Sequence, residues 1–139
     1  MSTNLACLFC RIVAGEEPGT IVDQDERTVS FMDIFPVTRG HVLVVPRQHA
    51  RDMYDIPPDD LTACTLAAQR LAARARSALR AEGANILQFS GSAGWQTIFH
   101  FHLHVVPRYG DDRLRLQWPP GPGDPGEIAE AAAALVSPT

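Results

Sequence analysis

Three of the five histidines in this chain alternate with apolar residues in the stretch from Phe99 to Arg108. Successive side chains of an extended strand point to opposite faces, so His100, His102 and His104 are predicted to share one face. The opposite face, predicted to lie buried under a helix, comprises Phe99, Phe101, Leu103 and Val105. A neutral imidazole can act as a nucleophile near pH 7 or bind a metal ion. The stretch therefore predicts a chemical site mounted on a core strand.

A second group of chemically active side chains is the pair Cys7-x-x-Cys10 near the start of the chain. This spacing lets two thiolates reach one metal ion from a tight turn, although two cysteines supply only half of a tetrahedral site. A redox pair is the alternative, but no strand leads into the pair as it does in thioredoxin-like proteins. Three cysteines in all do not indicate a disulfide framework.

The composition is that of a globular protein with one core. The chain has 139 residues, of which 45% are hydrophobic and 20% charged, so one domain over 1–139 is expected. The formal net charge of −4 argues against a broad interface with nucleic acid or a membrane surface. The sequence shows neither a membrane-span pattern nor a signal-peptide pattern, and the cytoplasm is the expected location.

Hydrophobic periodicity and turn residues predict the elements that must position these groups. In chain order they are a short helix over 7–15, a hairpin of strands over 20–24 and 28–32, a strand over 41–46, an amphipathic helix over 58–81 with Gly83 as its stop, and strands over 85–89 and 99–108. Cys64 lies on the apolar stripe of the long helix and is predicted to be a core residue. The tail over 116–125 is rich in proline and glycine, and the alanine-rich segment over 127–136 predicts a helix, loosely docked.

The loop from Ser90 to Thr97 is made mostly of small residues and leads directly into the histidine strand. Such a loop brings backbone N–H groups close to a ligand, as phosphate-binding loops do. An ordinary hairpin connection would have a similar composition. The loop's place before the histidines favours a role at the site.

These motifs together closely resemble those of the histidine-triad (HIT) family of nucleotide hydrolases and transferases. The resemblance is carried by His100-x-His102-x-His104-Val105-Val106 after Gln96-Thr97-Ile98, and by Cys7-x-x-Cys10, Phe31-x-Asp33-Ile34-x-Pro36, Gly40-His41 and Pro46-Arg47-x-His49. It covers a core of about residues 7–108, with 109–139 as a tail. The family fold is α+β: a five-stranded antiparallel sheet with one long and one or more short helices, usually in a homodimer.

The resemblance also implies roles for individual residues. His102 would be the nucleophile that attacks the α-phosphorus of a nucleotide conjugate, and His104 would donate hydrogen bonds to the phosphate oxygens. His41 would support the cluster, with a purely structural histidine as the alternative. The predicted substrate-binding residues are Ile12, Phe31 and Ile34 for the base (or plain core residues), Asp33 for the ribose, and Ser90, Gln96 and Thr97 for the phosphate or leaving group.

Cys7, Cys10, His49 and His100 form the Cys₂His₂ set of a closed tetrahedral zinc site. Some bacterial members of the family carry such a site, so the resemblance implies a structural Zn²⁺ held by these four residues. It would tie the amino-terminal segment to the sheet. The alternative is a free thiol pair without a metal.

Branches of the family differ at a few positions of this chain. His104 stands where the galactose-1-phosphate uridylyltransferase branch has glutamine, which points to the hydrolase branches. Ser90 stands where asparagine is common and Trp95 where glycine is frequent, so the leaving-group pocket departs from the family pattern.

The expected function is hydrolysis of a purine nucleotide conjugate, a phosphoramidate or acyl phosphate, with release of AMP through a nucleotidyl-histidine intermediate. One alternative is a dinucleoside polyphosphate hydrolase or phosphorylase with the same histidines. A second is a nucleotide-binding regulator without a catalytic role. A third is a small zinc protein in which all three histidines are metal ligands.

Overall fold

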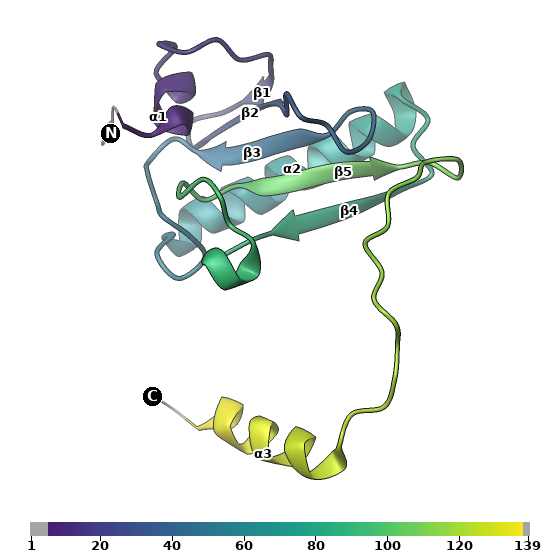
Figure 1. Cartoon of the computed structure of the whole chain (residues 1–139). Helices are drawn as coiled ribbons and strands as arrows, with labels where there is room; N and C mark the ends of the chain where they lie inside the picture. The colour runs from purple at the N-terminus through teal and green to yellow at the C-terminus, as the bar shows by residue number, and fades with distance from the viewer. Residues whose placement is uncertain (1–5, 138–139) are drawn as a thin grey trace.

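The protein, described by a computed structural model over residues 6–137, has a five-stranded antiparallel sheet in the order β1-β2-β3-β5-β4 (Figure 1). This α+β architecture confirms the predicted fold class. The strands are β1 (Ile21–Gln24), β2 (Thr28–Met32), β3 (Val42–Pro46), β4 (Gly83–Gln88) and β5 (Leu103–Arg108). The helices are α1 (Leu8–Val13), α2 (Pro58–Ala78), α3 (Pro125–Val136) and the 3₁₀ turn η1 (Ser92–Gly94).

The two faces of the sheet are covered by different helices, because the residues of β3 alternate between two hydrophobic clusters. Val42 and Val44 pack against α2, and Leu43 and Val45 pack against α1. Cys64 is fully buried in the α2 cluster, so its predicted place in the core is confirmed. The short helix α1 therefore lies on the face away from α2.

The long helix ends earlier than predicted. It stops at Ala78, and Arg80 takes the left-handed conformation (φ 60°) that turns the chain back toward the sheet. Gly83, predicted as the stop, instead begins β4. Sequence alone favoured glycine because arginine rarely adopts a positive φ.

The histidine strand is shorter than predicted, and its regular part begins only at Leu103. Leu103 is the first residue of β5, and it pairs with Val44 of β3 and with Gln88 of β4. β4 ends at Gln88, and the residues before Leu103 lie outside the ladder, where the Phe101 N–H donates to the carbonyl of Ala50.

Because the chain joins the ladder only at Leu103, the prediction that Phe99 is buried was wrong. Phe101, Leu103 and Val105 are buried under α2 as expected, but Phe99 is 37% exposed. Its ring lies under the guanidinium of Arg51, 5.1 Å from the ring centroid.

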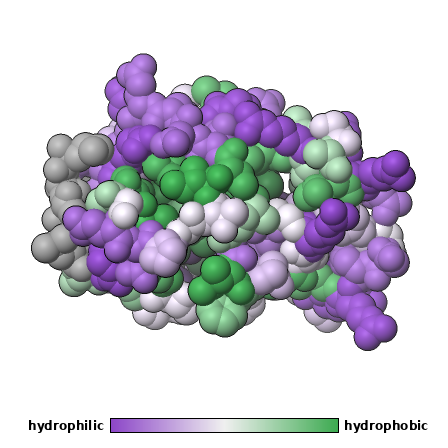
Figure 2. Space-filling view, turned by 90° about the horizontal axis from the view of Figure 1, so that it is seen from above, coloured by the Kyte–Doolittle hydropathy of each residue, from purple (hydrophilic) through white to green (hydrophobic). Residues whose placement is uncertain are grey.

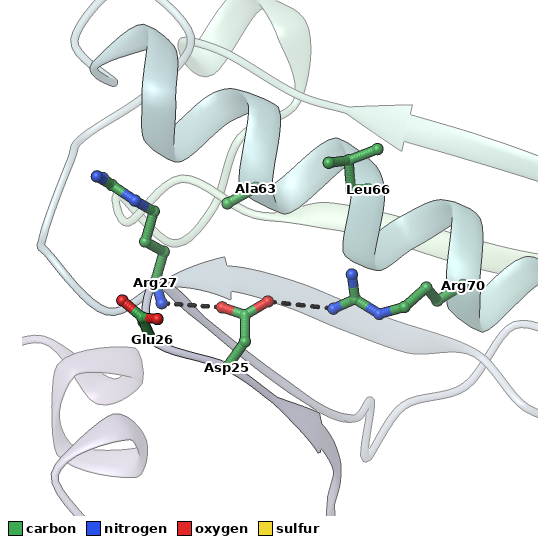
Figure 3. Close-up of a pocket in the computed structure, with 6 residues that line it drawn as sticks. All are labelled: Asp25, Glu26, Arg27, Ala63, Leu66 and Arg70. Atoms are coloured by element: carbon green, nitrogen blue, oxygen red, sulfur yellow. Dashed lines mark hydrogen bonds and ion pairs between the residues drawn. The ribbon is translucent and has the colours of Figure 1, made fainter.

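Ion pairs join the β1–β2 hairpin to α2 around a surface pocket of about 260 Å³ (Figure 3). The carboxylate of Asp25 accepts hydrogen bonds from the backbone N–H of Arg27 and from the guanidinium of Arg70. Arg70 and Arg74 also pair with Asp23, at 2.9 and 3.1 Å. The charges lining this pocket are thus largely neutralised by one another, which indicates a structural role.

The tail runs away from the sheet as an extended segment and ends in α3, which stands apart from the sheet (Figure 1). The helix begins where the side chain of Asp124 accepts from Glu127 N–H, and every residue of α3 is exposed. The predicted helix is confirmed, but in the single chain it is not docked. Within the described residues, no helix is long and apolar enough to span a membrane.

Candidate active site and metal centre

The four predicted zinc ligands converge at one point between α1, the segment after β3 and the segment before β5. The ligand atoms of Cys7, Cys10, His49 and His100 all lie within 4.8 Å of one another. His100 Nδ1 is 3.4 Å from each of the two sulfurs and 3.2 Å from His49 Nδ1, and Cys10 Sγ is 3.3 Å from His49 Nδ1. No backbone rearrangement is needed to bring them together.

These separations match those of a tetrahedral zinc site. With Zn–S about 2.3 Å and Zn–N about 2.0–2.1 Å, tetrahedral angles put sulfur and nitrogen about 3.5 Å apart and two nitrogens about 3.4 Å apart. His100 Nε2 lies 2.9 Å from the Pro46 carbonyl and donates to it, so Nδ1 is left free to bind the ion. The Cys10 N–H donates to Cys7 Sγ, as suits a thiolate. The residues present therefore fit Zn²⁺.

His102 presents a neutral ring nitrogen to the site. Its Nδ1–H donates to the carbonyl of His100 at 2.7 Å, so the lone pair belongs to Nε2. Burial lowers the pKa of His102 and keeps the ring neutral at pH 7. The nucleophile predicted from sequence thus has the required tautomer.

His41 and His104 are joined by a short hydrogen bond. Because Val37 N–H donates to His41 Nδ1, the proton of His41 is on Nε2, which donates to His104 Nδ1 at 2.9 Å. The remaining proton of His104 is therefore on its Nε2 and can be donated to a ligand. Burial lowers the pKa of His104 to about 4 and also lowers that of His41, so both rings are neutral at pH 7.

The carboxylate of Asp33, just after β2, lies beside this pair. Its Oδ2 is 3.4 Å from His41 Nε2, and its Oδ1 accepts from Phe35 N–H at 2.8 Å. Asp33, His41 and His104 also bring their ligand atoms within 4.8 Å of one another. The His41–His104 hydrogen bond and the contact between His41 and Asp33 account for this closeness. The structure thus places Asp33, the predicted ribose-binding residue, beside His41 and His104.

Two of the predicted loop residues, Gln96 and Ser90, make hydrogen bonds that hold the loop to the segments around it. The buried amide of Gln96 donates to the carbonyls of Arg51 and Ile98 and accepts from Gly91 N–H, so in this conformation neither amide hydrogen is left for a phosphate. Ser90 Oγ donates to Gln88 and accepts from Met53 N–H. Both side chains position the loop.

Thr97 belongs to a surface pocket next to the predicted zinc ligands. It is exposed and lines a pocket of about 390 Å³ together with Cys7 and His49. Thr97 therefore lies beside two of the predicted zinc ligands.

The three residues predicted to contact the base differ in how far they are buried. Ile12 and Phe31 are buried in the α1 cluster, which favours the core reading for both. Ile34, in the loop after β2, is 82% exposed and free to meet a ligand.

Sequence reasoning missed two aromatic residues that contact the histidines. The ring of Phe9 in α1 is 5.1 Å from His102, and that of Phe89, just after β4, is 5.2 Å from His104. The position of Phe9 between the two cysteines was a usable signal, whereas Phe89 looked like any strand residue. Centroids 5.0 to 6.2 Å apart link six rings in a series: Phe31, Phe9, His102, His104, Phe89 and Trp95.

Comparison with known proteins agrees with this geometry. The family model described as the HIT domain matches residues 14–111. An uncharacterized HIT-like protein of Mycobacterium tuberculosis is 41% identical over 110 residues, which cover 79% of this chain and 76% of that protein. A Candida albicans protein named adenosine 5′-monophosphoramidase is 31% identical over 124 residues, covering 86% of this chain and 82% of its own length.

A solved structure is similar over nearly the whole chain. The crystal structure of a Zn-bound histidine triad family protein from Mycobacterium smegmatis is 41% identical, with a TM-score of 0.78, covering 95% of this chain and 96% of that one. Fold, histidine cluster and matched family thus agree, and the chain belongs to the HIT family.

Proposed function

We propose that the protein hydrolyses adenosine nucleotide conjugates at the α-phosphate and releases AMP. The observation that carries this proposal is the tautomer of His102, whose Nδ1–H is held by the His100 carbonyl while burial keeps the ring neutral. Such a ring offers Nε2 as a nucleophile at pH 7 without a separate base.

The reaction would proceed in two displacements at phosphorus. In the first, His102 Nε2 forms a bond to the α-phosphorus as the bond from phosphorus to the leaving group breaks. An amine leaving group takes up a proton from solvent on its nitrogen and leaves as the neutral amine, and an acyl oxygen leaves as a carboxylate. In the second, water attacks the phosphorus, the bond to Nε2 breaks, and AMP leaves while the released proton passes to solvent. His104 Nε2–H would donate to a phosphoryl oxygen that gains charge in both steps.

Asp33 is the proposed partner of the ribose hydroxyls, because a carboxylate accepts hydrogen bonds from both. It follows β2, so the nucleoside would lie on the β2 side of the histidines. The name of the Candida albicans relative supports a phosphoramidate as the substrate class.

We assign Cys7, Cys10, His49 and His100 to a structural zinc ion. The ion would fix α1 to the end of the sheet and hold the His100 backbone, whose carbonyl orients His102. The catalytic steps themselves are carried by His102 and His104.

The experiment that tests the function is AMP release from an adenosine phosphoramidate and from diadenosine tetraphosphate, each with a His102→Ala variant. Faster turnover of the phosphoramidate, reduced at least about 1,000-fold in the variant, is the expected result. Faster turnover of the dinucleotide would favour the polyphosphate hydrolase reading. Binding without turnover would favour a regulator, and activity that survives in His102→Ala would refute the mechanism.

Zinc content of the same variants separates the enzyme from a zinc protein that uses all three histidines as ligands. His100→Ala is expected to lose the ion, whereas His102→Ala and His104→Ala keep it. Loss of zinc from the last two would overturn the assignment.

We further propose a homodimer that acts in the cytoplasm. Two surfaces support the dimer: β4 is an edge strand with Ile86 46% exposed, and α3 leaves Ile128 and Leu135 in water. Figure 2, seen from above, shows a further hydrophobic patch on the side of the molecule opposite α3, with hydrophilic residues along much of its border. A second copy would cover the β4 edge and α3.

A further inference from the structure

Trp95 is held in a backbone conformation that tryptophan rarely adopts. Its φ is 70°, in the left-handed region, and its side chain is 77% exposed. A bulky residue in this region is strained, and such strain is found most often at functional sites. Packing in the core does not offset this strain, because most of the Trp95 side chain is exposed.

The loop holds Trp95 firmly in this position. Trp95 N–H donates to Ser92 O and Gln96 N–H donates to Gly91 O, while the Gln96 amide joins the loop to Arg51 and Ile98. The indole thus projects from a turn that is held by hydrogen bonds. Its neighbour in the ring series is Phe89, with ring centroids 6.2 Å apart in an edge-to-face arrangement.

The position of Trp95 relative to the sheet defines which part of a substrate it meets. Phe31 belongs to β2 and Phe89 follows β4, and these strands flank the β3–β5 pair in the sheet order. The ring series therefore has Phe31 and Phe9 at one end, His102 and His104 in the middle, and Phe89 and Trp95 at the other end. If Asp33 holds the ribose on the β2 side, the group on the other side of the phosphorus extends toward β4.

We propose that Trp95, supported by Phe89, forms a leaving-group subsite that prefers conjugates with an aromatic leaving group. This inference rests on the proposed hydrolysis of nucleotide conjugates and names the class of conjugate. An exposed indole offers a flat π-face, which attracts another aromatic ring beyond the area that it buries. Trp95 is thus a specificity-determining residue, and it takes no part in the bond changes at phosphorus.

Two matched substrates isolate this effect. Adenosine 5′-phosphoramidates of 2-phenylethylamine and of 2-cyclohexylethylamine have alkylamine leaving groups of similar basicity and size, and only the first carries a π-face. The expected ratio of kcat/KM, phenyl over cyclohexyl, is about 5 for the unaltered protein. Trp95→Gly, which suits the positive φ and removes the ring, should bring the ratio to about 1, and Trp95→Phe should retain most of it.

A control variant and a binding measurement complete the test. Leu66→Ala, which trims an exposed apolar side chain on α2, should leave the ratio at its original value. Dissociation constants of both conjugates with His102→Ala should show the same preference without turnover. A ratio near 1 in the unaltered protein, or a ratio unchanged in Trp95→Gly, would overturn the subsite.

The same measurements keep this failure distinct from failure of the proposed function. Turnover of both conjugates with no effect of Trp95 would refute the subsite alone. A phenyl preference in binding that is lost in Trp95→Gly, with no turnover of either conjugate, would refute the hydrolase and keep the subsite. Absence of both binding and turnover would refute both.

Discussion

His100 and His102 are two residues apart and present opposite ring nitrogens to their surroundings. The Nε2–H of His100 donates to Pro46 O, so Nδ1 faces the two sulfurs. The Nδ1–H of His102 donates to His100 O, so Nε2 is left with the lone pair. In each case a backbone carbonyl selects the tautomer, and the selection separates the proposed metal ligand from the proposed nucleophile on one short segment.

The neutral state of His104 makes stability depend on pH. Its pKa is about 4 in the folded protein because of burial, and about 6.5 when unfolded. The unfolded chain therefore takes up a proton first as the pH falls, and folding free energy is lost between pH 6.5 and 4, at up to about 1.4 kcal/mol per pH unit for one such group. Above pH 6.5 this contribution is complete.

The variant His104→Gln should accordingly lose less stability than the unaltered protein between pH 7 and pH 4.5. Denaturant unfolding at a series of pH values measures the difference. Other buried histidines remain in both proteins, so both curves should still fall. Parallel curves would show that His104 is not neutral in the fold.

The residues around His102 could be predicted only where a sequence motif carries them. The alternation of the histidines, and the motifs around Asp33 and His41 that carry the family resemblance, predicted site residues that the structure brings close together. Neither Phe9 nor Phe89 was predicted, because their contacts depend on how α1 and β4 pack. The hydrogen bonds of Gln96 to the protein backbone could not be predicted either, because a side-chain amide can bond to a ligand or to a loop equally well.

At the scale of elements, α1 illustrates how six residues become a stable helix. A helix this short is unstable in water by itself. Here the Cys7 side chain accepts from Cys10 N–H at its start, and Phe9 and Ile12 pack on β2 and β3. The proposed zinc site supplies a third attachment, which predicts that the metal supports the fold as well as this helix.

Replacing one thiolate should therefore remove both the metal and stability. Cys10→Ser is expected to bind no stoichiometric zinc and to lower the melting temperature by at least about 10 °C. Metal analysis and thermal unfolding measure these effects, and a strong chelator should bring the unaltered protein to a similar melting temperature. The matched control is Cys64→Ala, which changes a core cysteine and should keep the zinc. A zinc-loaded Cys10→Ser protein would contradict the assignment.

Gly40 connects the loop after β2 to β3 at a place where only glycine fits. Its φ is +87°, and an added Cβ would lie 2.5 Å from Leu79 Cδ1 and 3.3 Å from Pro107 Cγ. Gly40→Ala should thus lower the free energy of unfolding by about 2–3 kcal/mol, through strain and overlap together.

Two glycines of the η1 loop serve as controls for Gly40→Ala in denaturant unfolding. Gly91 has φ +77° with open space around it, so Gly91→Ala should show the strain alone, about 1 kcal/mol. Gly94 has neither feature, and Gly94→Ala should stay within about 0.5 kcal/mol. Equal losses in all three variants would refute the role of Gly40 in packing.

Element types were predictable because periodicity and turn residues are local signals. The end of α2 and the start of β5 were not, because each is set by partners. β5 begins at Leu103, where pairing with β3 and β4 begins. Arg80 takes a left-handed turn conformation that arginine rarely adopts.

At the scale of the whole molecule, α3 is a helix without a partner surface in the single chain. A 12-residue helix gains little stability in water alone, so its alanine-rich sequence predicts helicity and says nothing of where it docks. Figure 1 places it beyond the β4 edge, away from the sheet. We expect the second copy of the proposed dimer to receive it.

Removing residues 118–139 should weaken the dimer by at least about tenfold in dissociation constant, because the exposed side chains of Ile128 and Leu135 go with the helix. Sedimentation of the full chain and of the truncated chain over a range of concentrations measures this. Zinc content should be unchanged, since the four ligands lie elsewhere. Identical dissociation constants would exclude α3 from the interface.

The ion pairs between the β1–β2 hairpin and α2 imply an uneven distribution of local opening. β1 is an edge strand with mostly exposed side chains, and Arg70 and Arg74 bind it through Asp23. Charges that reach the surface are screened by salt, whereas buried apolar contacts are not. Amide hydrogens of β1 should thus exchange with solvent earlier than those of β3, and added salt should widen the gap. The sheet would open from β1, on the side where Asp33 follows β2. The end of β3 beside the proposed zinc ligands would stay closed.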